Sequence, residues 1–253
     1  MIHYKSAAEL DKMRRSGRIL ADTILRVLEA VAPGTTTADL DGVAEERILA
    51  AGAVSNFKGY RGTYPATICT SVNAEIVHGI PSASRVLEEG DLLSLDFGCI
   101  WEGYHSDSAV SVFVGGVAPS SEAEHLVKVT EAALDAAIAA VVPGGRLTDI
   151  GAAIEEVAVP EGLGIVREYG GHGIGRAMHE DPFIQNFGPP GRGPALKPGL
   201  TVALEPMLNL GAEETRLLAD EWTVVTADGS LSAHFEHTVA VTEDGHEILT
   251  SRG

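Results

Sequence analysis

Two segments of this sequence match each other at an offset of 110 residues. The segment AVAPGTTTADLDGVAEE (30–46) aligns with AVVPGGRLTDIGAAIEE (140–156), and each places a Pro-Gly pair ahead of a run with helical periodicity. This internal repeat predicts two similar halves that share one core, roughly residues 6–116 and 121–242. A cleft between two such halves is a favoured position for a ligand site.

Each half begins with a pattern that is typical of a helix start. Ser6 precedes Glu9 by three residues, and Ser121 precedes Glu124 in the same way. Ser-x-x-Glu ahead of a periodic run indicates a capping box. Each half is therefore expected to run as a long helix, a Pro-Gly break, a second helix and then strands. The strand-like segments are 67–73, 91–100, 108–116, 199–208, 221–229 and 233–242.

Composition limits the functions that are open to the chain. No low-complexity linker divides it, so residues 1–253 are expected to form one domain of the α/β (α+β) class. The formal net charge of −18 argues against a protein that binds nucleic acid through its overall charge. Two cysteines are too few for a disulfide framework, which fits the cytoplasm. No signal peptide and no run of about 18 apolar residues is evident, so no membrane association is expected.

Four carboxylates occupy positions where strands usually carry apolar residues. A lone acid in a strand usually faces solvent, and that interpretation stays open for each of them. If they are buried instead, each ionised group costs several kcal/mol unless a partner compensates its charge. The four residues are Asp96, Asp107, Glu205 and Glu236.

Asp96 and Asp107 flank a predicted hairpin turn, in which Gly103 supplies the unusual backbone angles. If the turn is centred at 101–102, the two aspartates face each other directly. If it is centred at 102–103, they are diagonal neighbours on one face. Either arrangement puts their Cβ atoms roughly 4.5–8 Å apart. Two like charges so close destabilise a hairpin, and a multivalent cation would reverse that effect.

Charge and ligand chemistry favour a site for two metal ions. Two divalent cations would balance the charges of the four carboxylates. The segment EYGGHGIGRAMHEDP (168–182) adds His172, whose glycine neighbours allow a metal or a substrate to approach closely. Carboxylates with one imidazole suit Co, Mn, Fe or Zn. A phosphate loop is the alternative, but its lysine is absent and no helical pattern follows the glycines.

Five segments carry a resemblance that covers nearly the whole chain. They are GYRGTYPATICTSVNAEIVHGIP, LDFGCIWEGYHSD, GGHGIGRAMHEDP, LEPM and WTVVTADGSLSAHFEHTVAVT. In this order they resemble the motifs of the type I methionine aminopeptidases. The resemblance implies the pita-bread fold, in which helices of two pseudo-symmetric halves pack on a curved, mainly antiparallel β-sheet. It also implies a dinuclear metal centre in which Asp107 and Glu236 bridge the metals. The implied ligands are Asp96, Asp107, His172, Glu205 and Glu236.

The resemblance further implies a metal-dependent aminopeptidase that removes the initiator methionine ahead of a small second residue. A metal-held hydroxide attacks the carbonyl, and Glu205 manages the proton. His179 would hydrogen-bond the scissile carbonyl, and His78 would contact the amide beyond the cleaved bond. The residues implied for the methionine pocket could equally be ordinary core or loop packing. They are Tyr60, Tyr64, Cys69, Met178 and Trp222, together with Phe57.

The implied partners are the N-termini of nascent polypeptides, and the chain is expected to act as a monomer. Bacterial relatives often carry lysines near the segment that matches 211–229, where this chain has Arg216 as its one base. RNA phosphate should repel such a segment, so we expect weak, salt-insensitive ribosome association. The acids of this segment are Glu213, Glu214, Asp220, Glu221 and Asp228.

Two other functions fit parts of the sequence. A proline-specific aminopeptidase or dipeptidase of the same fold would share the paired aspartates. The segments HGIP (78–81) and SLSAHFEHT resemble the methionine enzymes instead, and the short N-terminus indicates no N-terminal extension and no preceding domain of the kind expected for a proline-specific enzyme. A non-catalytic binding protein on this scaffold would be expected to lose metal ligands, and all five are present here.

Overall fold

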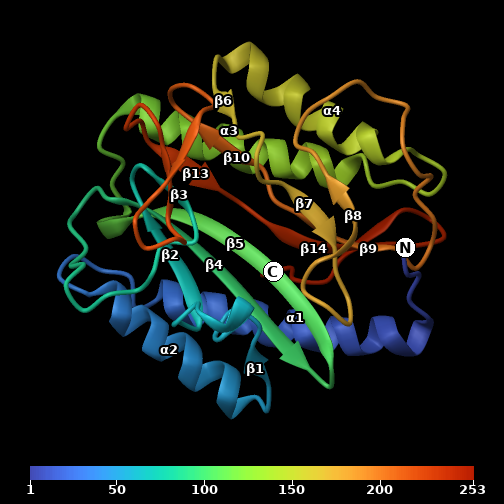
Figure 1. The fold of residues 1–253 in the computed structure, drawn as a ribbon, viewed down its shortest axis with the longest axis horizontal. Helices are drawn as coiled ribbons and strands as arrows, with labels where there is room; N and C mark the ends of the chain where they lie inside the picture. The colour runs from blue at the N-terminus through green and yellow to red at the C-terminus, as the bar shows by residue number, and fades with distance from the viewer.

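Two helix pairs lie on opposite sides of the β-structure in the computed structural model, which describes residues 1–253 (Figure 1). The pairs are α1 (Ala7–Leu28) with α2 (Thr37–Ala50), and α3 (Ser121–Ala139) with α4 (Leu147–Ala158). The strands between them pair antiparallel throughout. The predicted mixed architecture is confirmed. None of the helices combines the length and apolarity needed to cross a membrane.

The helix starts follow the sequence with one correction. Ser6 N–H donates to Glu9 Oε2 at 2.9 Å, so the first expected capping box is present. The prediction for the third helix was wrong by one residue, because Ser120 rather than Ser121 caps α3 by accepting from Ala123 N–H at 3.2 Å. Adjacent serines offer the same hydroxyl, so spacing alone does not tell which one precedes the helix.

The strands form four antiparallel sheets. The largest contains, in spatial order, β15 (His246–Ile248), β14 (His237–Val241), β9 (Thr201–Leu204), β7 (Gly171–Gly173) and β8 (Glu180–Ile184). A second contains β1 (Val54–Ser55), β4 (Leu92–Trp101), β2 (Ile68–Val72) and β5 (Tyr104–Phe113). One of the two small sheets contains, in spatial order, β13 (Ser232–His234), β10 (Met207–Asn209) and β6 (Gly164–Ile165). The other contains β11 (Thr215–Leu217), β12 (Val224–Thr226) and β3 (Glu75–Val77).

The matched Pro-Gly pairs adopt the same local structure in both halves. Gly34 has φ +90° and Gly144 has φ +87°, a region that glycine adopts without strain. The Gly34 amide donates to Leu87 O at 2.8 Å, and the Gly144 amide donates to Leu196 O at the same distance. Each break is therefore tied to a loop of its own half, which sets the angle between the two helices of a pair.

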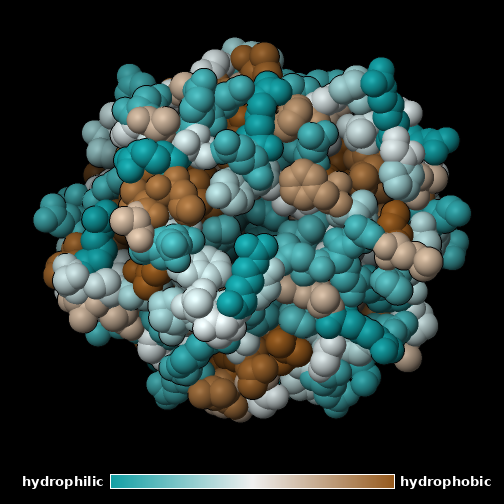
Figure 2. Space-filling model, viewed as in Figure 1, coloured by the Kyte–Doolittle hydropathy of each residue, from teal (hydrophilic) through white to brown (hydrophobic).

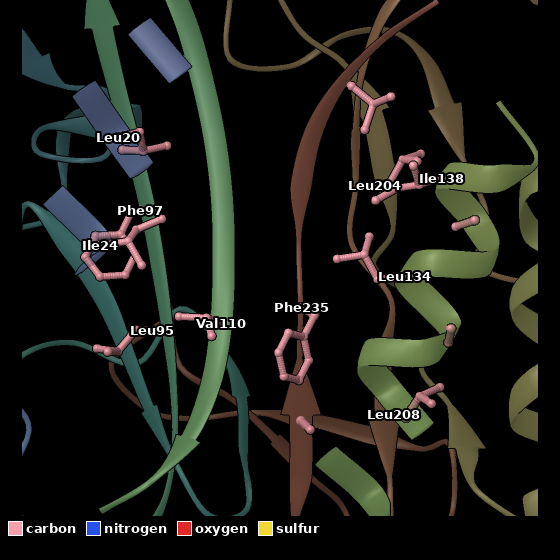
Figure 3. Packing of buried hydrophobic residues seen from close by; sticks show 14 of the residues in the cluster. Leu20, Ile24, Leu95, Phe97, Val110, Leu134, Ile138, Leu204, Leu208 and Phe235 are labelled. Carbon is pink, nitrogen blue, oxygen red and sulfur yellow. The ribbon is translucent and has the colours of Figure 1, made fainter. Parts of the chain in front are cut away.

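One hydrophobic core runs through both halves. On one side, Leu20 and Ile24 of α1 lie against Phe97 of β4, and on the other side α3 faces Leu204 and Phe235 (Figure 3). Full burial of such side chains contributes roughly 1.5–3 kcal/mol each. The halves meet where β5 exchanges backbone hydrogen bonds with Glu236, the residue that precedes β14: Glu236 N–H donates to Ala109 O at 3.0 Å, and Ala109 N–H donates to Glu236 O at 3.3 Å.

Two segments expected as single strands are each broken in two. Segment 199–208 forms β9 and β10 on either side of Glu205, and segment 233–242 forms β13 and β14 on either side of Glu236. The reason is topological: β9 pairs with β14, whereas β10 pairs with β13 in another sheet. The chain thus changes sheet at both glutamates, which frees their side chains from strand alternation.

Candidate active site

A cavity of about 500 Å³ lies between the two halves and gathers every predicted site residue. Figure 2 shows the corresponding face, which is mostly polar and hollowed near its centre. Residues from all four quarters of the chain meet here. The predicted residues that line it are Tyr60, Tyr64, Cys69, His78, Asp96, Asp107, His172, Met178, His179, Glu205, Trp222 and Glu236, together with Phe57.

The hairpin of β4 and β5 sets the spacing of Asp96 and Asp107. Its two turn residues both have positive φ, +46° at Glu102 and +78° at Gly103. This turn matches the right-handed twist of the flanking strands. The register pairs Asp96 with Ala109, two residues beyond Asp107. The aspartates are therefore diagonal neighbours on one face, the second of the two arrangements expected from the sequence.

The four carboxylates crowd the floor of the cavity. Asp107 and Glu236 are buried, at 4% and 2% exposure, while Asp96 and Glu205 keep part of their surface open to the cavity. Desolvation raises the pKa of Asp96 to about 7. Desolvation, and then repulsion by the neighbouring carboxylates, holds the pKa values of the other three well above their usual range. The interpretation that these acids face bulk solvent is excluded.

The donor set fits a divalent metal. One oxygen each of Asp96, Asp107 and Glu236 is buried without a hydrogen-bond partner. Ligand atoms of Asp107, His172 and Glu236 all lie within 4.8 Å of one another. Buried carboxylates without partners cost several kcal/mol each, and a cation between them would offset that cost. Hard oxygen donors with one imidazole are the ligands that divalent first-row metals accept.

The backbone of the next residue fixes the orientation of the His172 ring. Its Nδ1 lies 2.9 Å from Gly173 O, so Nδ1 carries the proton and Nε2 keeps a free lone pair. Nε2 lies 3.6 Å from Glu205 Oε1, on the side of the carboxylates. Desolvation lowers the pKa of His172 to about 3, so the ring is neutral at pH 7.

The glycines around His172 serve close strand packing. A Cβ at Gly171 would lie 2.5 Å from Ala203 O, and one at Gly173 would lie 2.2 Å from Asp181 O. Strand β7 runs between β8 and β9, and both neighbours approach its backbone more closely than any side chain allows. No phosphate loop forms here, because the segment is a strand followed by a turn rather than the start of a helix.

His179 and His78 face the same space as neutral rings. Tyr60 Oη lies 2.9 Å from His179 Nδ1, and the ring centroid of His179 is 4.2 Å from that of His172. Desolvation lowers the pKa of His179, with Arg61 adding to the effect. Desolvation also lowers the pKa of His78 to about 4, again with charge repulsion from nearby groups. Both histidines are therefore uncharged hydrogen-bonding groups at pH 7.

A small apolar cluster, separate from the main core, forms one wall of the cavity. The rings of Tyr64 and Trp222 meet edge to face at 5.1 Å, and the Tyr64 hydroxyl donates to backbone oxygens nearby. Burial raises the pKa of the Cys69 thiol well above its usual range, so Cys69 acts as a small hydrophobe. The cluster comprises Phe57, Tyr64, Ala66, Cys69 and Met178, with Tyr60, Ile80 and Trp222 packed against it.

Several lining residues were not expected from the sequence. Most lie on loops that reach the cavity from distant parts of the chain. Residues on loops follow no hydrophobic periodicity, so the sequence does not indicate that they line a cavity. The residue types of Arg61 and Glu221 likewise give no indication of their positive φ values, +48° and +64°. These additional lining residues are Arg61, Thr63, Glu168, Tyr169, Gly170, Phe183, Leu217 and Glu221.

Comparison with known proteins identifies the family. Metallopeptidase family M24 matches residues 11–243. Methionine aminopeptidase 1 of Mycobacterium tuberculosis is 50% identical over 256 residues, which cover 99% of this chain and 95% of that protein. This chain belongs to the methionine aminopeptidases of family M24. Both the predicted membership and the enzyme class are confirmed.

Solved structures agree with this membership. The crystal structure of methionine aminopeptidase from Thermotoga maritima superposes with a TM-score of 0.96 at 41% identity, covering 99% of this chain and 100% of that one. Prolidase from Pyrococcus furiosus reaches a TM-score of 0.75 at 21% identity, covering 98% of this chain and 65% of that one. The prolidase therefore shares the fold alone, and the expected pita-bread fold is confirmed.

Proposed function

We propose that this chain hydrolyses the peptide bond after an N-terminal methionine when the second residue is small. The observation that carries the proposal is the meeting, in one cavity, of a buried carboxylate cluster, neutral histidines and a separate apolar wall. The first two are the parts of a hydrolytic centre, and the third is a place for an uncharged, flexible side chain. The family's relatives named above carry the same activity in their names.

Two divalent metal ions, Co, Mn, Fe or Zn, would complete the site. The four carboxylates offer the charge to balance two such ions, and Asp107 and Glu236, the two most buried, are proposed to contact both. When bound, the metals would supply an activated water and polarise the scissile carbonyl. The proposed ligands are Asp96, Asp107, His172, Glu205 and Glu236.

The remaining steps belong to side chains of the chain itself. In the proposed tautomer, His179 Nδ1 accepts from Tyr60 Oη, which lies 2.9 Å away, and Nε2–H would donate to the carbonyl oxygen as its negative charge develops. Glu205, which lines the cavity, is proposed to take a proton from the attacking water at its carboxylate and to return it to the leaving amine. His78 would hydrogen-bond the amide beyond the cleaved bond and hold the leaving group in line.

The apolar wall is proposed to bind the methionine side chain. A thioether packs favourably against aromatic rings, and the rings of Tyr64 and Trp222, which both line the cavity, meet there. A protonated Cys69 thiol adds no charge to that surface. The proposed pocket residues are Tyr60, Tyr64, Cys69, Met178 and Trp222.

Hydrolysis of two tripeptides tests the function. Chelator-stripped protein, with Mn or Co titrated back, is expected to release methionine from Met-Ala-Ser and to leave Ala-Pro-Ser intact. The reason is that the apolar wall of the cavity suits a long, uncharged side chain such as that of methionine. Release of alanine ahead of proline would assign the site to the proline-specific branch. No release with any metal would favour a binding protein.

The organisation of the chain is proposed to follow its repeat. Residues 1–253 form one catalytic domain built from two related halves, which the equivalent Pro-Gly breaks and helix pairs support. We further propose a cytoplasmic monomer that acts on the N-termini of nascent polypeptides. Two reduced, buried cysteines are consistent with that compartment.

The acidic segment 211–229 predicts weak ribosome binding. Its exposed acids face solvent around β11, and RNA phosphate would repel them. In co-sedimentation with ribosomes at low salt, we expect less bound protein than for a relative with lysines in this segment, and little change as salt rises. A charge-reversed variant, Glu213→Lys with Glu214→Lys, should bind more strongly and lose that binding in salt. Equal binding by the unaltered chain and the lysine-bearing relative would refute this expectation.

A further inference from the structure

The first six residues, here called the N-terminal arm, lead from the start of α1 to the region beside β9 of the largest sheet (Figure 1). The Met1 ammonium pairs with Asp181 of β8. The Lys5 amide donates to Gly199 O at 2.7 Å, and a Cβ at Gly199 would lie 2.6 Å from Lys5 O. The arm of the first half is thus docked tightly on the second half.

Lys5 forms a buried ion pair inside this contact. Its Nζ lies 2.7 Å from Glu180 Oε2, and the two side chains are only 4% and 10% exposed. Nζ also donates to His3 O at 3.2 Å. Most other ion pairs of the chain are far more exposed, for example Lys12 with Glu102 at 41% and 53%. A buried pair of this kind is sensitive to removal of either partner, because the remaining charge is left in a poorly solvated place.

Glu180 also binds the backbone of the turn that precedes it. Its Oε1 accepts from the amides of Arg176 at 2.7 Å and Ala177 at 3.2 Å. The turn leaves no free space around Lys5, since a Cβ at Gly175 would lie 2.3 Å from Lys5 Cε. Desolvation opposes ionisation of Glu180, yet the bonds from Lys5 and the two amides lower its pKa overall. At neutral pH the Glu180 carboxylate is therefore charged, and both of its oxygens accept hydrogen bonds.

The turn leads directly into two residues of the active-site cavity. Met178 and His179 follow Ala177 without an intervening residue, and both line the cavity. We propose that Lys5 is a positioning residue, which acts through Glu180 to fix the turn 175–177 and so the places of Met178 and His179. The inference rests on the function proposed above for those two residues.

The test compares Lys5→Met with Lys12→Met. Methionine has a similar length and keeps the backbone bond to Gly199, so the arm stays docked while Glu180 loses its cation. We expect hydrogen exchange of the amides in 175–180 to rise about tenfold and kcat for Met-Ala-Ser to fall roughly tenfold, since displacements near 1 Å can cost that much or more. The dissociation constant for Mn, measured by calorimetry, should stay within about twofold. Lys12→Met, which removes an exposed ion pair, should match the unaltered protein in hydrogen exchange, kcat and Mn affinity.

A double variant separates positioning from a general loss of stability. In Lys5→Met with Glu180→Gln, the amide oxygen still accepts from the turn and no charge is left unpaired. We expect this variant to recover most of the lost exchange protection and kcat. Unchanged exchange and kcat in Lys5→Met would overturn the proposal, as would a uniform rise in exchange along the whole chain with weaker Mn binding. If the unaltered protein releases no methionine, the proposed function fails, and the exchange measurement still decides whether Lys5 orders the turn.

Discussion

Replacing His179 by alanine is expected to lower kcat for Met-Ala-Ser about 100- to 1,000-fold, the usual loss when one donor to a developing oxyanion is removed. His179 is neutral and shares a hydrogen bond with Tyr60, so its free Nε2–H is proposed to donate to the scissile carbonyl. Steady-state kinetics with saturating Mn measure the effect. Binding of Mn should remain, because His179 is outside the proposed ligand set.

Two further variants sharpen this expectation. Tyr60→Phe removes the hydroxyl that holds His179 Nδ1 and should cause a smaller loss, on the order of tenfold, because the ring stays but its tautomer is no longer selected. His125→Ala, on the exposed surface of α3, serves as the matched control and should leave kcat unchanged. A loss in His179→Ala that appears only in Mn affinity would show that His179 is a ligand and would contradict its proposed role.

Without metal, the buried carboxylates and the neutral histidines are expected to have opposite effects on stability as pH rises from about 4 to about 7. The histidines, whose pKa values are lowered, take up protons on unfolding and so favour a gain in stability below about pH 6.5. The pKa of Asp96 is raised to about 7 in the folded chain, against about 3.9 in an unfolded one. At this group the folded state binds more protons than the unfolded state across this range, so its contribution to the free energy of unfolding falls by up to roughly 1.4 kcal/mol per pH unit. The other three carboxylates, whose pKa values are also raised, steepen the loss.

Metal should reverse the trend. Mn binds the ionised carboxylates of the folded state alone, and a hundredfold excess over its dissociation constant adds about 2.7 kcal/mol to the free energy of unfolding. Urea unfolding at pH 5, 6, 7 and 8, with chelator or with Mn, measures both effects. Asp96→Asn, which cannot titrate, should lack this falling contribution, so its stability relative to the unaltered metal-free protein should rise between pH 5 and 7, while Asp39→Asn on the surface of α2 should show no such change. A difference between Asp96→Asn and the unaltered protein that does not change with pH over this range would show that Asp96 is not buried as described.

Much of the site could be predicted from local chemistry. Acids in apolar strands needed a compensating partner, and the hairpin turn at Glu102 and Gly103 limited Asp96 and Asp107 to two arrangements. Both inferences need only short-range rules, since desolvation and turn geometry act within a few residues. The choice between the two arrangements needed the observed register, because both turns suit the same residues.

The roles of the glycines beside His172 were harder to predict. The sequence indicated space for a metal, whereas the structure shows strands β8 and β9 lying against the backbone of β7. Glu205 and Glu236 were likewise expected at the end and inside of continuous strands, and both lie where the chain changes sheet. The sheet to which a strand belongs depends on which distant strand supplies its hydrogen bonds. The alternation of polar and apolar residues along the strand does not identify that partner.

The sequence by itself determined the helix pairs, the hairpin and, through its motifs, the family, and it marked the four acids as the residues whose burial would need a partner. These depend on periodicity, capping and charge, which are local properties of the chain. Tertiary structure alone decided which groups act together. Tyr60 meets His179 across 119 positions, and Lys5 meets Glu180 across 175. Contacts at such separations form only when both halves have packed, because each partner's side chain is equally compatible with solvent until the opposing surface removes the water around it.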